Sequence, residues 1–426
     1  MLARLDEARA AGVVLGLDRT RAVLARLGNP QREFITVQIA GTNGKGSTAA
    51  MTDAILRASG LPTGLYTSPH LSRFTERIRV DGREADGDRL ALLDQAIAAT
   101  GVPLTYFEIA TVLAFLTFAE SGVRIVVAET GLGGRLDATT TCEPVATAIT
   151  SIAWDHAEWL GSSLAEIAAE KAGIAKPGVP LFLAPVPPDA DAAIAQIAAR
   201  VGAPLRRLGT DFQAPAEILG LRGAHQTTNA ALAVALADAA ARAAQGGGLD
   251  GSAVAAGLRE VRWPGRLEWV APDVLLDCAH NAEGAAALAA ELDRLPRGPR
   301  ALLFSVVAGK PAAAMLRMLV PRFDAVFVTE SSNPRSVPAA ALREIASSDV
   351  DGQVPVHGKV GVEVTAVPHP VAALTAARAK VGAGGGAGGL IVGAGSTFLV
   401  GDLRAHLLGE PRDPILTSDP LSRLSP

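Results

Sequence analysis

Four side chains of this sequence carry the chemical groups needed to hold a metal ion beside a phosphate. Lys45 lies in a glycine-rich loop, and Ser68, Glu129 and His156 each follow a short apolar run. A hydroxyl, a carboxylate and an imidazole can bind magnesium between the oxygens of a nucleotide and a substrate, although histidine is an unusual magnesium ligand. Each residue alone also has an ordinary interpretation, as a helix-capping serine, a glutamate paired with Arg135 and a solvated histidine. Their shared position at strand ends, downstream of a phosphate loop, favours the metal site.

The segment around Lys45 has the order strand, glycine loop, helix. Ile35–Ala40 is an apolar run rich in β-branched residues, which predicts a buried strand. Three glycines and a run of helix formers follow, so backbone N–H groups and a helix N-terminus could surround a phosphate. Lys45 would contact the outer phosphates, and Ser47 or Thr48 could bind magnesium. The usual pattern has Ser or Thr directly after the lysine, whereas Gly46 stands here, and the alternative is a glycine turn with a solvated lysine.

Strands and helices are expected to alternate through the first half of the chain. Apolar runs at Gly64–Thr67, Arg124–Ala128 and Val145–Ile152 predict further strands. Such alternation predicts an α/β fold with a mostly parallel sheet covered on both faces. Open sheets of this class bind ligands at the carboxyl ends of their strands, so the candidate metal ligands should converge on one crevice.

The second half of the chain repeats this pattern after the irregular segment Val261–Leu267. We therefore predict two domains, a P-loop ATP-binding domain at residues 1–265 and a Rossmann-like α/β domain at residues 266–426. A chain of 426 residues is also too long for one ordinary core. The glycine-rich stretch Gly382–Gly389 is interpreted as a tight surface turn, and the tail after Gly409 as poorly ordered.

Composition excludes several classes of function. The net charge of −4 gives no reason to expect a nucleic acid or an anionic membrane as partner. Cys142 and Cys278 are far apart, which suits a reducing compartment. Neither a signal peptide nor a membrane span is evident in the sequence. We expect a cytoplasmic monomer that acts on small molecules.

A series of motifs carries a resemblance to a known family. They are G-T-N-G-K-G-S, T-S-P-H-L, T-E-R-I, L-T-Y-F-E, E-T-G-L-G-G-R-L-D-A-T, S-I-A-W-D-H-A-E-W-L-G, E-K-A-G-I-A-K-P-G, H-Q-T-T-N-A and D-C-A-H-N. From about Leu17 to Leu403, in this order, the chain resembles the folylpolyglutamate synthase/dihydrofolate synthase family of the Mur ligase superfamily. The resemblance implies ATP-dependent amide bond formation between a pteroyl carboxylate and the amino group of L-glutamate.

The same resemblance implies residues for the nucleotide and its metal ions. ATP would contact Thr42, Asn43, Gly44, Lys45, Gly46, Ser47, Thr48, Asn229, Arg266 and Asp277. Two magnesium ions would be bound by Ser47, Ser68, Glu129 and His156. Lys171 would otherwise be interpreted as a solvated helical lysine, but it matches a lysine that is carbamylated in the family. Carbamylation requires a neutral amine, so we expect a lowered pKa for Lys171, which joins Lys45 and His156 as an implied catalytic residue.

The resemblance also implies where the two substrates bind. The pterin substrate would contact Thr105, Tyr106, Phe107, Glu108, Leu136, Asp137 and Ala138, and L-glutamate would contact His280 and Ser396. A carboxylate is a poor acyl donor, and transfer of the γ-phosphoryl group of ATP would turn it into an acyl phosphate. Closure of the two domains about Pro264–Gly265 would keep water from this intermediate.

Two positions depart from the family pattern, and three alternatives stay open. Thr140 stands where asparagine is usual, and Gly309 precedes Lys310 where an Asp-Lys pair is common. A cell-wall Mur ligase would carry a whole domain before the phosphate loop, yet only forty residues precede Gly41, fewer than the ~50 of a small domain. The D-C-A-H-N motif disfavours a P-loop switch protein. Within the family, L-T-Y-F-E favours a bifunctional enzyme that acts on dihydropteroate as well as folates over one that only adds glutamate to folates.

Overall fold

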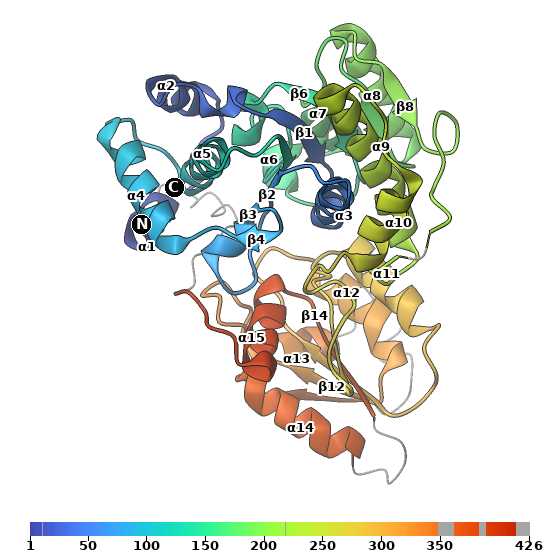
Figure 1. Cartoon of the computed structure of the whole chain (residues 1–426). Coiled ribbons are helices and arrows are strands. Elements are labelled where there is room, and N and C mark those ends of the chain that lie inside the picture. Colours follow the sequence, from blue (N-terminus) through green and yellow to red (C-terminus); the bar gives the residue numbers. More distant parts are fainter. Residues whose placement is uncertain (11, 218, 348–361, 383–388, 415–426) are drawn as a thin grey trace.

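The computed structural model describes residues 1–10, 12–217, 219–347, 362–382 and 389–414, which form two lobes, each built on one sheet (Figure 1). The first sheet has the order β4-β3-β2-β5-β1-β6-β7-β8, and the second has the order β13-β12-β11-β14-β10-β9. The predicted α/β class is therefore confirmed. The surface turn predicted at Gly382–Gly389, apart from its two end residues, and the tail beyond residue 414 lie outside the described residues.

The first sheet is parallel around its centre. Its middle strand β1 (Ile35–Ala40) lies between β5 (Ile125–Glu129) and β6 (Pro144–Ile149). The parallel strands β2 (Thr63–Tyr66), β7 (Leu181–Leu183) and β8 (Leu205–Arg207) extend it, and the antiparallel strands β3 (Ile78–Val80) and β4 (Arg83–Glu84) complete one edge. The carboxyl ends of the parallel strands consequently lie along the same edge of the sheet.

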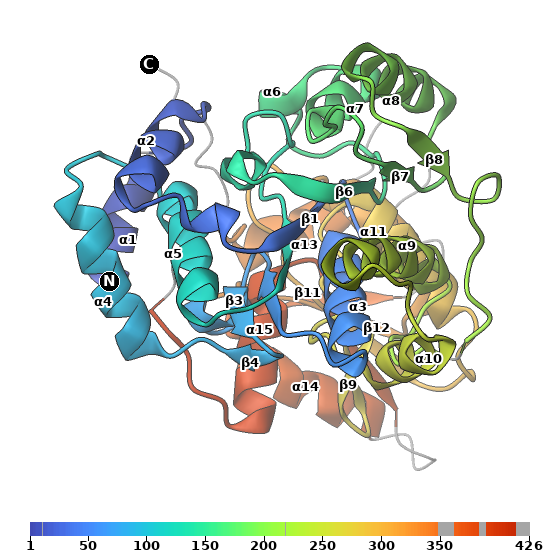
Figure 2. The same ribbon diagram turned by 45° about the horizontal axis from the view of Figure 1, so that its top comes forward.

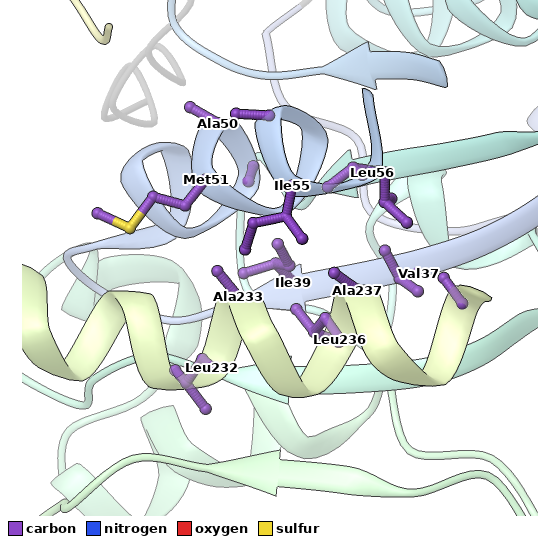
Figure 3. Packing of buried hydrophobic residues seen from close by; sticks show 14 of the residues in the cluster. Val37, Ile39, Ala50, Met51, Ile55, Leu56, Leu232, Ala233, Leu236 and Ala237 are labelled. Atoms are coloured by element: carbon purple, nitrogen blue, oxygen red, sulfur yellow. The ribbon is translucent and has the colours of Figure 1, made fainter. Parts of the chain in front are cut away.

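Helices bury both faces of this sheet. Alternate residues of β5 show this, because Val127 joins the cluster formed with α3 (Lys45–Ala58) and α9 (His225–Gln245), whereas Val126 joins the cluster formed with α5 (Tyr106–Glu120). Figure 3 shows how side chains of α3 and α9 meet beside the end of β1. Each large aliphatic side chain buried there contributes about 1.5–3 kcal/mol, so the loop between β1 and α3 rests on a firmly packed base.

The remaining helices of the first lobe lie in three places, which the second view separates (Figure 2). Beside α5 lie α1 (Leu2–Ala10), α2 (Asp18–Arg26) and α4 (Gly87–Ala99). Beyond β6 and β7 lie α7 (Leu164–Ala172) and α8 (Pro188–Val201), and α10 (Gly251–Glu260) packs on α3. Short elements are α6 (Ala157–Leu160) and the 3-10 turns η1 (Pro30–Arg32), η2 (Phe74–Arg77) and η3 (Ala138–Thr141).

The second sheet has one antiparallel edge strand on a parallel core. The parallel strands are β10 (Val274–Leu276), β11 (Arg300–Phe304), β12 (Ala325–Val328), β13 (Glu363–Ala366) and β14 (Leu390–Ala394), and β9 (Glu268–Ala271) pairs antiparallel with β10. One face packs on α11 (Ala282–Leu292), α12 (Ala312–Leu319) and α13 (Ala339–Ser347), with η4 (Val320–Arg322), and the other on α14 (Pro370–Gly382) and α15 (Thr397–Leu408).

The chain crosses between the lobes once more after α15. The segment that follows this helix runs back toward the first lobe (Figure 1). Asp413 donates its backbone N–H to the carbonyl of Ser72 (2.9 Å) and accepts a hydrogen bond from the N–H of Phe74 (2.7 Å). The loop that leads into η2 is thus held by residues from the far end of the described chain.

Candidate active site

The phosphate loop adopts a conformation that requires glycine. Gly44 has a φ of +88°, in the left-handed region, and is the N-cap of α3. A Cβ on Gly46 would lie 3.0 Å from Nε1 of Trp263 and 3.4 Å from Oε2 of Glu129. The glycine that interrupts the usual pattern after Lys45 is therefore explained by the groups packed against it. The first N–H groups of α3 have no acceptor within the helix and are available to an anion.

Glu129 ends β5 as a buried carboxylate beside the loop lysine. Its Oε1 lies 4.0 Å from Nζ of Lys45, and its Oε2 accepts a hydrogen bond from the backbone N–H of Ser68 (3.2 Å). Burial raises the pKa of Glu129, and the charge of Lys45 partly offsets this effect. Arg135 pairs with Glu170 instead (2.8 Å). The ordinary interpretation of Glu129 as the partner of Arg135 is therefore wrong.

Lys171 is buried against the phosphate loop. It lies near the end of α7 with 5% of its surface exposed, and its Nζ donates a hydrogen bond to the carbonyl oxygen of Gly41 (2.8 Å). Burial, assisted by the charge of Lys45, lowers the pKa of Lys171 to about 7. The ordinary interpretation as a solvated lysine is wrong, and the expected lowering of its pKa is confirmed.

The other predicted metal ligands lie around the same loop. Ser68 follows β2, and His156 is the N-cap of α6, in the loop after β6, with a φ of +52°. The imidazole Nε2 of His156 lies 3.8 Å from Oδ1 of Asp155, and 24% of the side chain is exposed. The hydroxyl of Ser47, in the first turn of α3, accepts a hydrogen bond from Nε2 of Gln226 (3.4 Å).

Three predicted nucleotide-binding residues come from outside the phosphate loop. Asn229 on α9 donates to the side-chain oxygen of Gln226 (2.9 Å), the residue that contacts Ser47. Asp277 follows β10 and accepts hydrogen bonds from the N–H groups of Leu267 and Ala279, both at 2.9 Å. It therefore fixes the linker, and with it Arg266, against the second sheet.

The predicted pterin-binding residues fall into side chains that shape the wall and side chains that are free to contact a ligand. Thr105 and Glu108 form a capping box at the start of α5, and Glu108 also pairs with Arg19 (2.9 Å). Asp137 accepts hydrogen bonds from the N–H groups of Gly131, Leu132 and Thr139, at 2.9 to 3.0 Å. These carboxylates hold the backbone, whereas Tyr106, Phe107, Leu136 and Ala138 supply apolar surface.

Side chains of both lobes meet beside the phosphate loop. Nζ of Lys310 lies 2.6 Å from Oδ1 of Asp155, and Nε2 of His280 lies 3.5 Å from its Oδ2. Asn43 and Asn281 exchange side-chain amide hydrogen bonds of 3.2 and 3.0 Å. Burial alone would raise the pKa of Asp155, but the hydrogen bond of His280 and the neighbouring positive charges hold it far below its usual range.

One cavity of about 460 Å³ brings nearly all of these residues together. Its walls include every predicted site residue except Thr48, which is fully buried behind the loop. Ser396 lines it from the second sheet, where its hydroxyl caps α15 by accepting from the N–H of Phe398 (3.2 Å). The predicted convergence on one crevice is thus seen in the geometry, while the role of each residue stays a prediction.

Within the described part of the chain, no group of three or more His, Cys, Asp and Glu side chains is placed to hold a metal ion by itself. The predicted ligand set contains only two such residues, Glu129 and His156, together with the hydroxyls of Ser47 and Ser68. This donor set suits magnesium that is also bound by phosphate oxygens, because magnesium usually takes one or two protein carboxylates and completes its shell with substrate. The residues present therefore fit the implied ions.

Comparisons with known proteins agree with the motifs. Residues 39–211 match the Mur ligase middle domain, and residues 265–396 match the Mur ligase glutamate ligase domain. The chain is 38% identical over 359 residues to the dihydrofolate synthase/folylpolyglutamate synthase of Bacillus subtilis, covering 76% of this chain and 83% of the relative. The chain therefore belongs to the folylpolyglutamate synthase/dihydrofolate synthase family of Mur ligases.

Solved structures of the folylpolyglutamate synthase/dihydrofolate synthase family superpose on both lobes. E. coli FolC in complex with DHPP and ADP is 29% identical with a TM-score of 0.84, covering 96% of this chain and 97% of that one. The bifunctional enzyme of Yersinia pestis, complexed with AMPPNP and a Mn ion, is 30% identical with a TM-score of 0.83, covering 96% and 97%. The predicted family, the P-loop and Mur ligase fold and the ligase class are confirmed.

Some relatives in this family are longer than the present chain. A probable bifunctional folylpolyglutamate synthase/dihydropteroate synthase of Halobacterium salinarum is 35% identical over 442 residues, which cover 95% of this chain but 52% of the relative.

No helix in the described ranges has the length and apolar character to cross a bilayer.

The structure accounts for both departures from the family pattern. Thr140 donates its hydroxyl hydrogen to the carbonyl of Gly134 (2.6 Å) and accepts a hydrogen bond from Gln38 (2.8 Å), so it is fully satisfied in its buried position. Gly309 has a φ of +90°, which only glycine adopts readily, and places Lys310 against Asp155.

Sequence reasoning missed several charged residues of the cavity wall, among them Asp155, Arg77 and Lys310. Asp155 directly precedes His156, the residue that the sequence assigns to the metal site. Lys310 follows Gly309 at a departure from the family pattern, and Arg77 belongs to the T-E-R-I motif. All three line the cavity. Their position next to residues already singled out was the available signal, whereas their contacts come from segments far apart in the chain.

Proposed function

We propose that this protein joins L-glutamate to the carboxyl group of dihydropteroate and of folyl-glutamates, with conversion of ATP to ADP and phosphate. The observation that carries the proposal is the single cavity whose walls combine the phosphate loop, the aromatic surface of Tyr106 and Phe107, and the second-lobe residues His280 and Ser396. A ligase needs these three kinds of surface within one reaction volume, because nucleotide, acid and amine must meet.

The proposed reaction begins with activation of the acid. The carboxylate oxygen attacks the γ-phosphorus of ATP, ADP leaves, and the product is an acyl phosphate. Lys45 and the N–H groups at the start of α3 stabilise the charge that spreads over the transferred phosphoryl oxygens. The glutamate amine then attacks the acyl carbon, the C–O bond to phosphate breaks, and inorganic phosphate leaves as the amide forms. The amine loses one proton in this step.

Two magnesium ions are proposed at Ser47, Ser68, Glu129 and His156, where they would neutralise phosphate charge and align the reacting oxygens. The buried carboxylate of Glu129 has one lysine 4.0 Å away and one backbone donor, so it retains acceptor capacity for an ion. The Mn ion named with the Yersinia pestis structure supports a divalent ion in this family.

Lys171 is proposed to act as a carbamate. Its neutral amine would attack carbon dioxide, forming a C–N bond and releasing a proton, and the product is an anion. A pKa of about 7 leaves roughly half of the amine neutral at pH 7. The carbamate would lie beside Lys45, the cation that in the unmodified protein helps to lower this pKa.

We further propose the division into residues 1–265 and 266–426, with the second lobe closing about Pro264–Gly265 when nucleotide and acid bind. The two separate sheets and the two family matches support it. We also propose that the protein is cytoplasmic, which the two buried free cysteines support, and that it works as a monomer.

The decisive experiment measures ADP release by the purified protein with dihydropteroate or tetrahydrofolate as sole acid, each with and without L-glutamate. ADP release that requires both an acid and glutamate supports the ligase, and activity with both acids supports the bifunctional enzyme. Activity with tetrahydrofolate alone would leave a folylpolyglutamate synthase. Release that needs neither would contradict the proposal. Carboxylate labelled with ¹⁸O tests the acyl phosphate, because one labelled oxygen must appear in the released phosphate.

A further inference from the structure

Arg77 is a buried cation that the proposed reaction leaves without a role. It ends η2 with none of its surface exposed, and its Nε donates a hydrogen bond to Nδ1 of His70 (2.8 Å). The guanidinium carbon lies 6.0 Å from the ring centroid of Phe74 and 5.3 Å from that of Tyr106. Burial and the charge of Arg77 lower the pKa of His70, so its imidazole is neutral and compensates no charge.

The two terminal nitrogens of Arg77 lack hydrogen-bond partners. Among the described residues, neither Nη1 nor Nη2 has an acceptor at hydrogen-bonding distance and angle, and no carboxylate lies within ion-pair distance of them. The hydroxyl of Tyr106 is close enough for Arg77 to offset part of the rise that burial causes in the pKa of this tyrosine, but the two groups do not form a well-aligned hydrogen bond. Arg300, another buried arginine of this chain, shows the hydrogen bonding expected of a purely structural side chain. Its terminal nitrogens donate to the carbonyl oxygens of Leu292, Leu295 and Pro296 at 2.8 to 2.9 Å. A guanidinium is always charged, so leaving its nitrogens unpaired in a buried position is costly unless a ligand completes them.

The position of Arg77 identifies the kind of ligand. It lines the cavity together with Ser68, Tyr106 and Phe107, and its charge offsets part of the rise that burial causes in the pKa of Glu129. The phosphates of the nucleotide have their own cation and backbone donors at Lys45. The part of the cavity around Arg77 is the part assigned above to the acid substrate, whose only negative groups are carboxylates. A carboxylate also matches the planar fork of a guanidinium.

We propose that Arg77 binds a carboxylate of the acid substrate and thereby determines specificity for ionised acids. The inference rests on the proposed function. The carboxylate is either the one that becomes phosphorylated or the α-carboxylate of a folyl-glutamate tail, and the chemistry of recognition is the same for both. Arg77 contributes by holding this group in place while the aromatic surface of Phe107 holds the ring system.

The test compares ligands that differ only in charge. Isothermal titration calorimetry gives the Kd of pteroate and of its carboxamide, and of folate and its α-carboxamide, for the wild type and for Arg77→Gln. The wild type should bind one or both acids about 10- to 100-fold more tightly than the matched amide, since a charged hydrogen bond is worth ~1.5–3 kcal/mol. Arg77→Gln should reduce that ratio to about threefold or less.

The carboxylate that Arg77 binds is identified by the acid–amide pair whose Kd ratio falls in Arg77→Gln. Loss with pteroate assigns the reacting group, and loss confined to folate assigns the α-carboxylate. The matched control is Arg83→Gln, which removes an exposed positive charge from β4 close by in the chain and should leave both ratios unchanged. Equal weakening of acid and amide by Arg77→Gln, or an unchanged ratio, would overturn the inference, because either result describes a merely structural side chain.

If circular dichroism shows that Arg77→Gln does not fold, a second variant replaces it in the test. Arg77→Lys keeps the charge but loses the planar fork, and should lower the acid-to-amide ratio about three- to tenfold. An unchanged ratio in this variant would equally overturn the inference. Failure of the proposed function is recognised separately, because it appears as absence of acid- and glutamate-dependent ADP release by the wild type.

Discussion

The two sheets place polar residues at the carboxyl ends of parallel strands in contrasting ways. At the first sheet, Glu129 at the end of β5 and Lys171, which reaches the adjacent phosphate loop from α7, are buried with few partners, and burial shifts the pKa of both. At the second sheet, Asp277 and Ser396 use their oxygens to hold the backbone of their own lobe. Costly, incompletely paired groups are concentrated where phosphoryl chemistry is proposed, and the second lobe supplies rigid walls.

Among the variants that test this contrast between the two sheets, replacement of Lys45 should lower kcat the most. Lys45→Met removes the cation nearest Glu129 and the proposed phosphate contact, and kcat should fall by about 10³-fold or more. Lys380→Met, which removes an exposed lysine paired with Glu363 on the second lobe, is the matched control and should change kcat less than twofold, a change of ~0.4 kcal/mol or less. Similar losses in the two variants would show that the buried charge at the first sheet has no special role. Steady-state kinetics of ADP release measures both.

Replacement of Lys171 should have the next largest effect on catalysis. Lys171→Ala removes the proposed carbamate, and kcat should fall about 100-fold or more, the scale of losing one electrostatic contact in an active site. Short carboxylic acids added to this variant should restore part of the activity, because they supply the missing anion. A variant that keeps wild-type kcat, or that no anion rescues while its fold is intact, would contradict the role of a carbamate. Activity with and without acetate or formate provides the measurement.

The pH dependence of stability should also differ between the first sheet and the rest of the chain. The pKa of Lys171 is about 7 in the folded protein and 10.5 in the unfolded chain, so the unfolded chain binds more protons between these values. The free energy of unfolding, relative to Lys171→Met, should therefore rise from pH 7 toward pH 10, by at most ~1.4 kcal/mol per pH unit. Urea unfolding in buffer depleted of carbon dioxide measures it. A difference that stays flat or falls with pH would show that Lys171 is not buried as an amine.

The contact between the lobes should have a smaller effect. Lys310→Met leaves the carboxylate of Asp155 without its nearest cation, and the KM for ATP or L-glutamate should rise about tenfold, or ~1.4 kcal/mol. Arg378→Met, which breaks an ion pair with Asp273 within the second lobe, is the control. A double-mutant cycle with Asp155→Asn should show that the two changes are not additive. Additive effects would mean that the ion pair does not link the lobes.

Replacement of Ser396 should have the smallest effect and should act on stability. Ser396→Ala removes the cap of α15, which costs about 0.5–2 kcal/mol of unfolding free energy. Ser396→Thr keeps a hydroxyl and should recover most of this loss. Thermal unfolding measures the difference, and the KM for glutamate shows whether the hydroxyl also contacts substrate. A large rise in KM without a loss of stability would assign Ser396 to binding and weaken the contrast between the sheets.

Sequence patterns located the long central strands well and the edges poorly. The run Ile35–Ala40 coincides with β1, because a strand buried on both faces is a continuous apolar run bounded by glycine. The short strands β3, β4, β8, β9 and β13, which lie at or next to the edges of the sheets, were not predicted. Strands of two to four residues with one exposed face lack a periodic signal, and their pairing depends on neighbours distant in the sequence.

The parts of the candidate site that could be predicted from the sequence are those whose reactive groups lie within one local motif. The phosphate loop and the strand-end carboxylate follow from residue types and spacing, whereas the burial of Lys171 followed only from family resemblance. The unpaired state of Arg77 could not be predicted, because it depends on which acceptors are missing in three dimensions. The same holds for Lys310, whose partner Asp155 lies in the other lobe.

The returning segment at Asp413 reinforces the part of the first lobe that lies beside the linker. Asp413 forms hydrogen bonds with Ser72 and Phe74, and the adjacent Leu71 lies against the linker, since a Cβ on Gly265 would be 3.5 Å from its Cδ1. The linker and the returning segment therefore meet the first lobe at the same loop, next to η2. If the lobes close about Pro264–Gly265 as proposed, this loop should be the part of the first lobe that moves least.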